Sequence, residues 1–358
     1  MKVCVLDLYI GPRHIKEVTA LKKLGIEFVF ARGSLYHKNL GIMEEMCPVE
    51  FVEKRQDVLD VCERHRVDLI HSHNYPDTIG LWGLWAARKL GIPIVHECHD
   101  TAYEVLGDAG FDSVLRNPEY NWVTFDRLLE EACILRNADA VIAVSDGMAK
   151  YIKHSHGRDA TVIHAYPPKD HLPEPVTDMP KHFRNCVYEG GILINETKGR
   201  FNHRYYEDIF QKLTDQGIFI HVYPGRDMVE AYPNPDVHFH ACVQDVRQLY
   251  QFMSKYHFGV IPVNRTDSPC LNFALPNKLF EYIGCGLPIL CMEFDAMAEF
   301  VRENGIGVVL GDDLRLPTDF DEQMRKAKQN VLNLVGKKYV METQAKKLKA
   351  LYEELLCQ

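Results

Sequence analysis

Three features that would point to particular classes of protein are missing from this sequence. No uncharged apolar run reaches the roughly 18 residues that a membrane-spanning helix needs. The eleven cysteines form no C-x-x-C pair, which argues against a disulfide framework and favours reduced, buried thiols in a cytoplasmic protein. Basic residues are not in excess, because the net charge is -9, and this disfavours nucleic acid as a partner. The sequence leaves open that a local basic patch makes a peripheral contact with the inner face of a membrane.

What the sequence does contain is a regular alternation of apolar strands and helices. The 358 residues leave room for two domains of ordinary size. In residues 1–165, near-continuous apolar strands at about 2–7, 26–31, 68–72, 92–96 and 140–144 alternate with helical segments. The first of these is too short, and too polar with Asp7, to be a signal peptide. The alternation predicts a Rossmann-like domain with a parallel sheet covered on both faces, whose ligands lie at the carboxyl ends of the strands.

The same pattern returns in the second half after a proline-rich stretch. Residues 166–185 contain five prolines and predict a connection without regular structure. Strands and helices alternate again over residues 186–335, which predicts a second Rossmann-like domain. The amphipathic segment 336–358 predicts a terminal helix that packs at the domain junction or on the first domain.

Polar residues gather where the predicted strands of the first domain end. One strand ends in His71-Ser72-His73-Asn74 and the next in His96-Glu97-Cys98-His99-Asp100. Zinc is one alternative for these residues, but H-x-H and H-x-x-H on separate strand ends match no known closed zinc spacing, so we predict no metal. Backbone hydrogen bonding in loops is the plainer alternative for any single histidine. The best use of His99, with Asp100 beside it, is as a general base or as a donor to a sugar hydroxyl or a phosphate.

The stretch 268–288 carries the strongest signal of the second domain. Pro276 suits the first turn of a helix, and Gly284 and Gly286 end it. A helix start preceded by a loop favours phosphate, Lys278 adds a positive charge, and Glu281 could accept hydrogen bonds from ribose hydroxyls. The alternative is an amphipathic helix with solvated charges. Gly190 and Gly191, with Lys198 or Arg200, could contact the far side of a diphosphate, or could form a plain strand-to-helix turn.

Over nearly its whole length the chain resembles the retaining family 4 glycosyltransferases, which have the GT-B fold of two Rossmann-like domains that face a deep cleft. The resemblance rests on DLIHSH at 68–73, VHECHD at 95–100, ADAVIAVS at 138–145 and PNKLFEYIGCGLPIL at 276–290. It implies that the second domain binds a nucleotide-sugar donor and that the first binds the acceptor, which is a glycan, a lipid-linked molecule or a small molecule.

The resemblance also implies roles for individual residues. Glu281 would bind the ribose, and Asn277 and Lys278 the diphosphate. His99 would lie near the donor sugar, and the acceptor near Arg13, His14 and His73. Phe273 departs from the pattern, because it stands where the family often has a glutamate that contacts the donor sugar, and this puts the identity of that sugar in doubt.

The implied activity is a retaining, hexosyltransferase-type transfer without a metal or a cofactor. The leaving diphosphate would accept the proton of the acceptor, so that no pair of catalytic carboxylates is needed. Two alternatives stay open. A catalytically silent GT-B subunit could bind a glycan or a partner transferase, or the chain could be a nucleotide-sugar epimerase.

Overall fold

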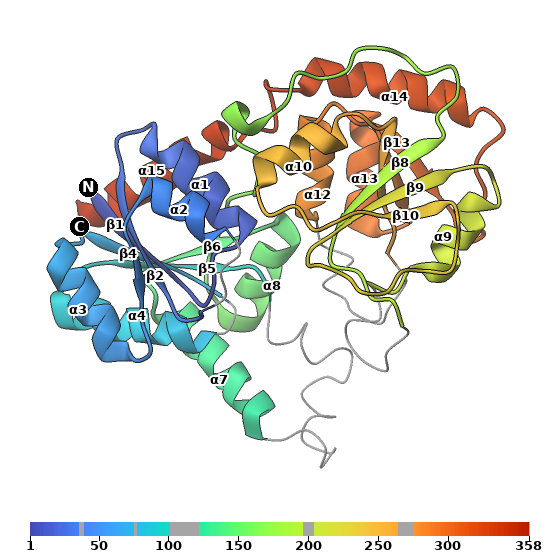
Figure 1. The fold of residues 1–358 in the computed structure, drawn as a ribbon. Coiled ribbons are helices and arrows are strands. Elements are labelled where there is room, and N and C mark those ends of the chain that lie inside the picture. The colour runs from blue at the N-terminus through green and yellow to red at the C-terminus, as the bar shows by residue number, and fades with distance from the viewer. Residues whose placement is uncertain (36–38, 75–76, 101–121, 196–203, 264–274, 358) are drawn as a thin grey trace. The chain divides into compact units, whose positions relative to one another are not determined.

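The chain divides into two compact units, each with its own sheet and core. The computed structural model describes residues 1–358 except 36–38, 75–76, 101–121, 196–203, 264–274 and 358 (Figure 1). Unit 1 consists of residues 1–168 and 341–358, and unit 2 of residues 169–340. The division at Pro168 falls inside the proline-rich stretch, and the terminal helix belongs to unit 1.

Unit 1 contains a parallel sheet of seven strands in the order β3-β2-β1-β4-β5-β6-β7. Its central strands are buried on both faces, and each contains an apolar run before its polar carboxyl end. The order reverses between β1 and β4, so this is the topological switch point of the sheet. The strands are β1 (Lys2–Asp7), β2 (Glu27–Arg32), β3 (Val49–Phe51), β4 (Leu69–His73), β5 (Ile94–Cys98), β6 (Ala140–Ala143) and β7 (Thr161–Val162).

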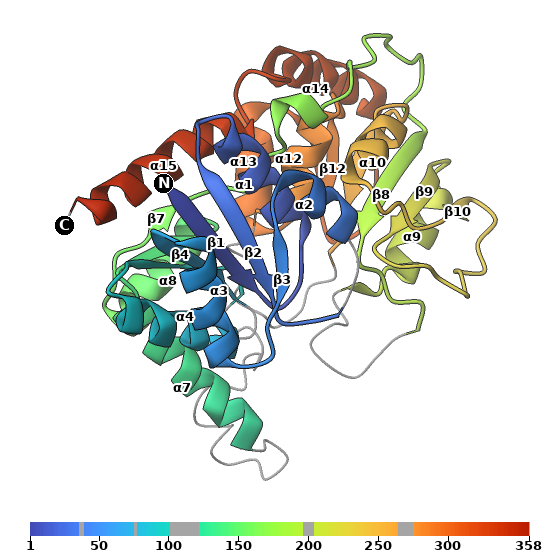
Figure 2. The same ribbon diagram turned by 60° about the vertical axis from the view of Figure 1, so that its left-hand side comes forward.

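Helices cover both faces of this sheet (Figures 1 and 2). The first of them, α1, begins at Pro12, whose missing N–H costs nothing in a first turn. The last, α15, packs against α1, and Lys23 and Glu342 form an ion pair there at 2.8 Å. The helices are α1 (Pro12–Lys22), α2 (Leu40–Met46), α3 (Arg55–His65), α4 (Asp77–Leu90), α7 (Trp122–Asn137), α8 (Asp146–His156) and α15 (Met341–Leu356).

Unit 2 repeats the architecture with a parallel sheet of six strands in the order β10-β9-β8-β11-β12-β13. Here the switch point lies between β8 and β11. The strands are β8 (Asn185–Gly190), β9 (Phe219–Pro224), β10 (Val237–Phe239), β11 (Phe258–Ile261), β12 (Ile289–Met292) and β13 (Gly307–Leu310). The helices are the short η1 (Lys169–His171), α9 (Glu207–Thr214), α10 (Val246–Met253), α12 (Asn277–Gly284), α13 (Asp295–Asn304) and α14 (Phe320–Leu334).

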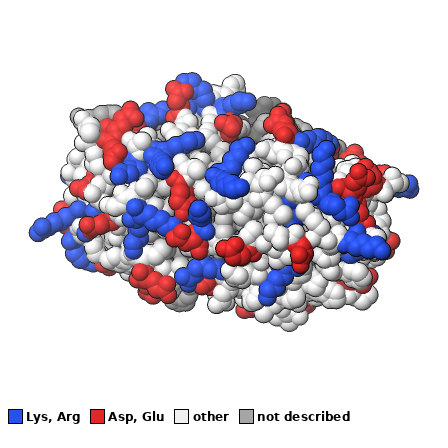
Figure 3. All heavy atoms as spheres, turned by 90° about the horizontal axis from the view of Figure 1, so that it is seen from above, with Lys and Arg blue, Asp and Glu red and all other residues white. Residues whose placement is uncertain are grey.

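These sheets confirm the predicted class, two doubly wound α/β domains. The helix α2 and the strand β3 were not predicted, because both are too short to show a periodic pattern. On the face drawn in Figure 3, basic and acidic side chains are interspersed. Among the helices that the structure describes, none is long and apolar enough to cross a bilayer.

Candidate active site

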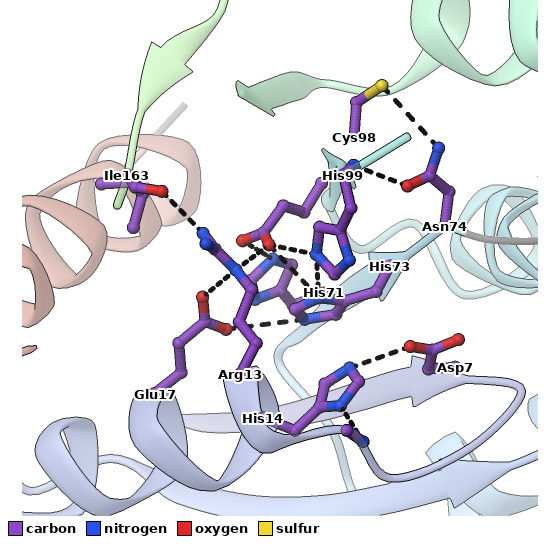
Figure 4. A network of polar contacts seen from close by, with 12 residues as sticks. Asp7, Arg13, His14, Glu17, His71, His73, Asn74, Cys98, His99 and Ile163 are labelled. Atoms are coloured by element: carbon purple, nitrogen blue, oxygen red, sulfur yellow. Dashed lines mark hydrogen bonds and ion pairs between the residues drawn. The ribbon is translucent and has the colours of Figure 1, made fainter. Parts of the chain in front are cut away.

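The polar strand ends of unit 1 meet at the switch point between β1 and β4. Helix α1 follows β1 there, and its first turn carries Arg13 and, four residues later on the same face, Glu17. The neighbouring β4 brings His71 and His73, and β5 brings Glu97, with His99 just beyond its end. Alternate residues of a strand share a face, so each pair points to the same side of the sheet. Figure 4 shows the side chains of Arg13, Glu17, His71, His73 and His99 turned toward one another.

The network centres on the guanidinium of Arg13, which lies against two buried carboxylates. Its Nε is 2.9 Å from Glu17 Oε1, and it also forms an ion pair with Glu97 Oε1. Its Nη2 donates to the carbonyl of Ile163 at 2.7 Å. Arg13 is 6% exposed, and both carboxylates are fully or nearly buried. Since a buried charge without a partner is costly, this arrangement keeps all three groups in the interior.

The two carboxylates differ in their protonation. Burial, and then the negative charge of Glu97, raise the pKa of Glu17 well above its ordinary value. Burial alone would also raise the pKa of Glu97, but the charge of Arg13 and the facing imidazoles outweigh it and lower that pKa. Glu97 is therefore the ionised member of the pair near neutral pH.

Two neutral histidines surround Glu97. Burial lowers the pKa of His71, and it lowers that of His73 even further. His71 Nε2 lies 3.6 Å from Glu97 Oε2, and His73 Nδ1 lies 3.5 Å from Glu97 Oε1. On its other side, His71 Nδ1 lies 2.7 Å from the hydroxyl of Tyr352, which comes from α15. The terminal helix thus reaches the centre of the network.

His99 is held at the edge of this network from two directions. Its Nε2 contacts Glu97 Oε1 and lies 3.1 Å from His73 Nδ1. Its backbone N–H donates to Asn74 Oδ1 at 2.6 Å. The side chain of His99 is 22% exposed, whereas those of Glu97 and His73 are fully buried. Of the predicted polar cluster in unit 1, His99 is therefore the imidazole that combines solvent access with a fixed orientation.

A metal ion would find four suitable donors here. Glu17, His71, His73 and Glu97 each offer one ligand atom, and these atoms lie within 4.8 Å of one another. The guanidinium of Arg13, however, contacts both carboxylates and supplies the positive charge that an ion would bring. Of the residues first considered for zinc, His71, His73 and His99 lie on the same side as Glu97, whereas His96 and Cys98 lie on the opposite face of β5. The prediction that no metal takes part stays a prediction.

That opposite face contains a second buried group, which has the composition of a hydrolytic triad. Ser72 Oγ lies 2.9 Å from His96 Nδ1, and His96 Nε2 lies 3.3 Å from Asp77 Oδ1. All three are 2% exposed or less. Because a nucleophile must reach its substrate, this burial identifies a structural contact between β4, β5 and α4.

In unit 2 the switch point brings the end of β8 and the start of α12 together. Gly190 has φ +116°, a conformation that other residues rarely adopt, and Lys278 Nζ would lie 3.3 Å from a β-carbon built there. The same Nζ lies 4.2 Å from the centre of the Tyr188 ring. A β-carbon on Gly191 would lie 2.7 Å from Arg204 Nη1. Two cations therefore border the glycine pair, at the edge of the sheet where open α/β domains bind ligands.

Helix α12 also carries the predicted ribose ligand. Pro276 is the residue that caps the helix, and Asn277 is exposed in its first turn. Glu281 is 5% exposed, and its Oε1 accepts a hydrogen bond from the hydroxyl of Tyr250 at 3.2 Å. This fixes the orientation of the carboxylate. Its binding to a ribose stays a prediction.

The other predicted site residues fall into three groups. Arg13, His14 and His73 are brought together but are buried, with His14 Nε2 3.0 Å from Asp7 Oδ2. Asp100 is exposed beside His99. Lys198, Arg200 and Phe273 lie outside the described residues. The assignment of acceptor binding to the first group and of catalysis to Asp100 stays a prediction.

Five residues of these sites were not among the predictions. Glu97 and Asn74 stood in the polar strand ends, and the spacing of two between Glu97 and His99 was a usable signal. Glu17 follows Arg13 by one helical turn. Tyr352 and Arg204 gave no local signal, because only the fold brings them to the sites.

Comparison with known proteins gives one family and one fold. Residues 48–168 match the model of the family described as Glycosyltransferase Family 4. HepE of Anabaena in complex with UDP-glucose is 13% identical, with a TM-score of 0.70 over 99% of this chain and 100% of that one. MnaA of S. aureus with UDP is 14% identical, with a TM-score of 0.55 over 100% and 98%. The calicheamicin glycosyltransferase CalG4 is 11% identical, with a TM-score of 0.52 over 99% and 98%.

At such identities the structural likeness shows the fold, and it confirms the GT-B architecture predicted from the sequence. The comparison with curated proteins finds no match.

Proposed function

We propose that this chain, which matches the model of glycosyltransferase family 4 over residues 48–168 and has the GT-B fold, transfers a sugar from a nucleotide-diphosphate sugar to an acceptor hydroxyl. The transfer is of the hexosyl type and retains the anomeric configuration. The donor binds to unit 2 and the acceptor to unit 1. The acceptor is a glycan, a lipid-linked molecule or a small molecule.

The observation that carries this proposal is the position of Lys278 beside Gly190. A glycine with positive φ leaves room for a ligand to approach the backbone, and the ammonium lies next to it at the start of α12. A diphosphate is the group that such a site suits, because the free N–H groups of a helix start and a lysine both attract it. Glu281, one turn along the helix, would accept from the two ribose hydroxyls.

The reaction needs little from the protein beyond placement and charge. The bond between the anomeric carbon and the diphosphate oxygen breaks, and a bond from that carbon to the acceptor oxygen forms on the same face. The acceptor proton passes to the leaving diphosphate. Lys278 and Arg204 stabilise the developing negative charge, and His99 accepts a hydrogen bond from a hydroxyl of the donor sugar. No metal or cofactor takes part in this proposal.

UDP-sugars are the first donors to test, because HepE has been crystallised with UDP-glucose and MnaA with UDP. The purified protein is heated with a panel of nucleotides and nucleotide sugars. A ligand that binds only the folded state raises the melting temperature, and the true donor should raise it most. Turnover of this donor with candidate acceptors is then measured as the amount of nucleoside diphosphate released.

Two matched variants separate this proposal from its alternatives. Lys278→Ala should lower the transfer rate by about 10²–10³-fold, the range for a preorganised donor group. Lys255→Ala is the control. Lys255 also lies near an aromatic ring, with its Nζ 5.5 Å from the centre of the Phe252 ring, but it does not border the glycine pair. Equal activity of both variants would contradict the proposal. Binding of a nucleotide sugar without transfer would favour the silent subunit, and interconversion of free nucleotide sugars would favour the epimerase.

The compartment belongs to the same proposal. The cysteines that the structure describes are all free, and most are buried. Free thiols suit a reducing compartment, so we place the enzyme in the cytoplasm, where nucleotide sugars and a peripheral contact with the inner face of the membrane would both be within reach.

A further inference from the structure

We propose that Glu97 is a positioning residue, whose ionised carboxylate fixes His99 as the tautomer that carries its proton on Nε2 and leaves Nδ1 free for the substrate. This inference rests on the proposed function in one respect, namely that His99 is the group that faces the donor. Glu97 itself is fully buried and touches no substrate.

The contacts of Glu97 show N–H groups facing both of its carboxylate oxygens. Arg13 contacts Glu97 Oε1 and has only N–H groups to offer. Burial raises the pKa of Tyr352, so its phenol keeps its proton and donates to His71 Nδ1. Neutral His71 then carries its own proton on Nε2, which faces Glu97 Oε2 at 3.6 Å. Glu97 Oε1 thus faces the N–H groups of Arg13, and Glu97 Oε2 faces the N–H of His71.

The tautomer of His99 follows from this arrangement. Its Nε2 contacts Glu97 Oε1, and two acceptors at that distance would repel each other, so Nε2 must carry a hydrogen. The same hydrogen faces His73 Nδ1 at 3.1 Å, which leaves the proton of neutral His73 on Nε2, toward Glu17 Oε2. Among the described residues, no hydrogen-bond partner is found for Nδ1 of His99. This nitrogen is therefore the one available to a substrate at the exposed edge.

Two further contacts make the orientation rigid. Asn74 Oδ1 accepts from the backbone N–H of His99 at 2.6 Å, so the main chain is fixed as well as the ring. Arg13 is anchored by Glu17 and by the carbonyl of Ile163, so it cannot follow a displaced Glu97. A carboxylate that orients an imidazole from behind is the arrangement by which enzymes select a histidine tautomer.

The matched variants are Glu97→Gln and Glu131→Gln. Both remove one buried carboxylate that contacts a histidine, but Glu131 Oε1 lies 3.1 Å from His156 Nε2, whereas Glu97 contacts His99. If Glu97 positions His99, Glu97→Gln lowers kcat by roughly 10–100-fold, as residues that orient a histidine from behind do, with KM for the donor changed by less than about threefold. Glu131→Gln keeps kcat within about threefold of the wild-type value. Glu97→Asp, which keeps the charge, recovers part of the loss.

The decisive measurement does not depend on activity. Protein labelled with ¹⁵N-histidine is studied by long-range ¹H–¹⁵N NMR, and the signals of His99 are assigned by their loss in His99→Asn. The wild-type protein should show Nε2 protonated and Nδ1 bare, and Glu97→Gln should show protonated Nδ1, because a glutamine amide can donate to Nε2.

Each outcome has a separate meaning. Protonated Nδ1 in the wild-type protein overturns the inference even if Glu97→Gln fails to fold, and so does an unchanged tautomer in a folded Glu97→Gln protein. Equal loss of kcat in Glu97→Gln and Glu131→Gln also overturns it, because the shared effect would be that of a destabilised unit 1. If the tautomer is as expected but no nucleotide sugar is bound or transferred, the proposed function fails and the positioning of His99 stands.

Discussion

Replacement of Gly190 by alanine tests the geometry on which the proposed donor binding in unit 2 depends. Gly190 ends β8 with φ +116°, and its carbonyl accepts a hydrogen bond from Gly225 N–H at 2.9 Å. An alanine in this conformation is strained by about 1–3 kcal/mol. Alanine also lowers the conformational entropy of the unfolded chain relative to glycine, and this offsets about 0.4–1 kcal/mol of the strain. The middle of these two ranges gives a net loss of roughly 1.3 kcal/mol for Gly190→Ala.

The added methyl group also changes the donor site directly. It would lie 3.3 Å from Lys278 Nζ, a tight contact that the flexible lysine can relieve by moving. That movement takes the ammonium away from the position where a diphosphate would meet it. Gly190→Ala should therefore weaken donor binding by more than the loss of stability alone explains.

Gly225→Ala is the matched control for Gly190→Ala. A β-carbon on Gly225 would meet backbone atoms of Gly190 and Gly191 at 3.5 Å or more, which is ordinary van der Waals contact, and its φ is not positive. Thermal unfolding should show Gly190→Ala lower in Tm by roughly 2–8 °C, and Gly225→Ala within about 1 °C of the wild-type protein. Calorimetric titration of the donor then compares affinity. A Gly190→Ala protein as stable and as tightly binding as Gly225→Ala would refute this reasoning.

Two further predictions concern one buried and one partly buried histidine. Tyr352→Phe removes the donor to His71 Nδ1 and leaves that acceptor buried, so urea unfolding of unit 1 should show a loss of about 1–3 kcal/mol, and an unchanged midpoint would contradict the contact. In unit 2, burial and the nearby His238 and His240 lower the pKa of His221 from 6.5 to about 4. The unfolded chain then binds more protons between these values, so stability is complete above pH 6.5 and falls as the pH drops through about 4. His221→Gln should flatten this part of the curve of stability against pH, and parallel curves would contradict the assignment.

The fold was predictable because its signals are local. Apolar strands such as β1 and β4, separated by helices of ordinary length, indicate a parallel sheet without knowledge of any distant contact. The positive φ of Gly190 was equally foreseeable in kind, since a glycine pair at a strand end is typical of a backbone that approaches another group. The edge strand β3 was not, because three residues carry too little pattern.

The candidate site was predictable only in part. The polar strand ends at His73 and His99 were identified, but as residues open to a ligand. The structure instead buries His73 among Glu17, Glu97 and His71, and leaves His99 partly exposed. Burial depends on what packs over a strand end, and no pattern along one strand encodes it.

The sequence by itself determined which side chains share a face. The periods of helix and strand align Arg13 with Glu17, His71 with His73, and Glu97 with His99. Only the tertiary structure decided that these three pairs meet, because β1, β4 and β5 became neighbours at a switch point and α15 returned to bring Tyr352 onto His71. The physical reason is range: backbone periodicity acts over a few residues, whereas the charge state of Glu97 depends on groups that are distant in the chain and close only in the folded protein.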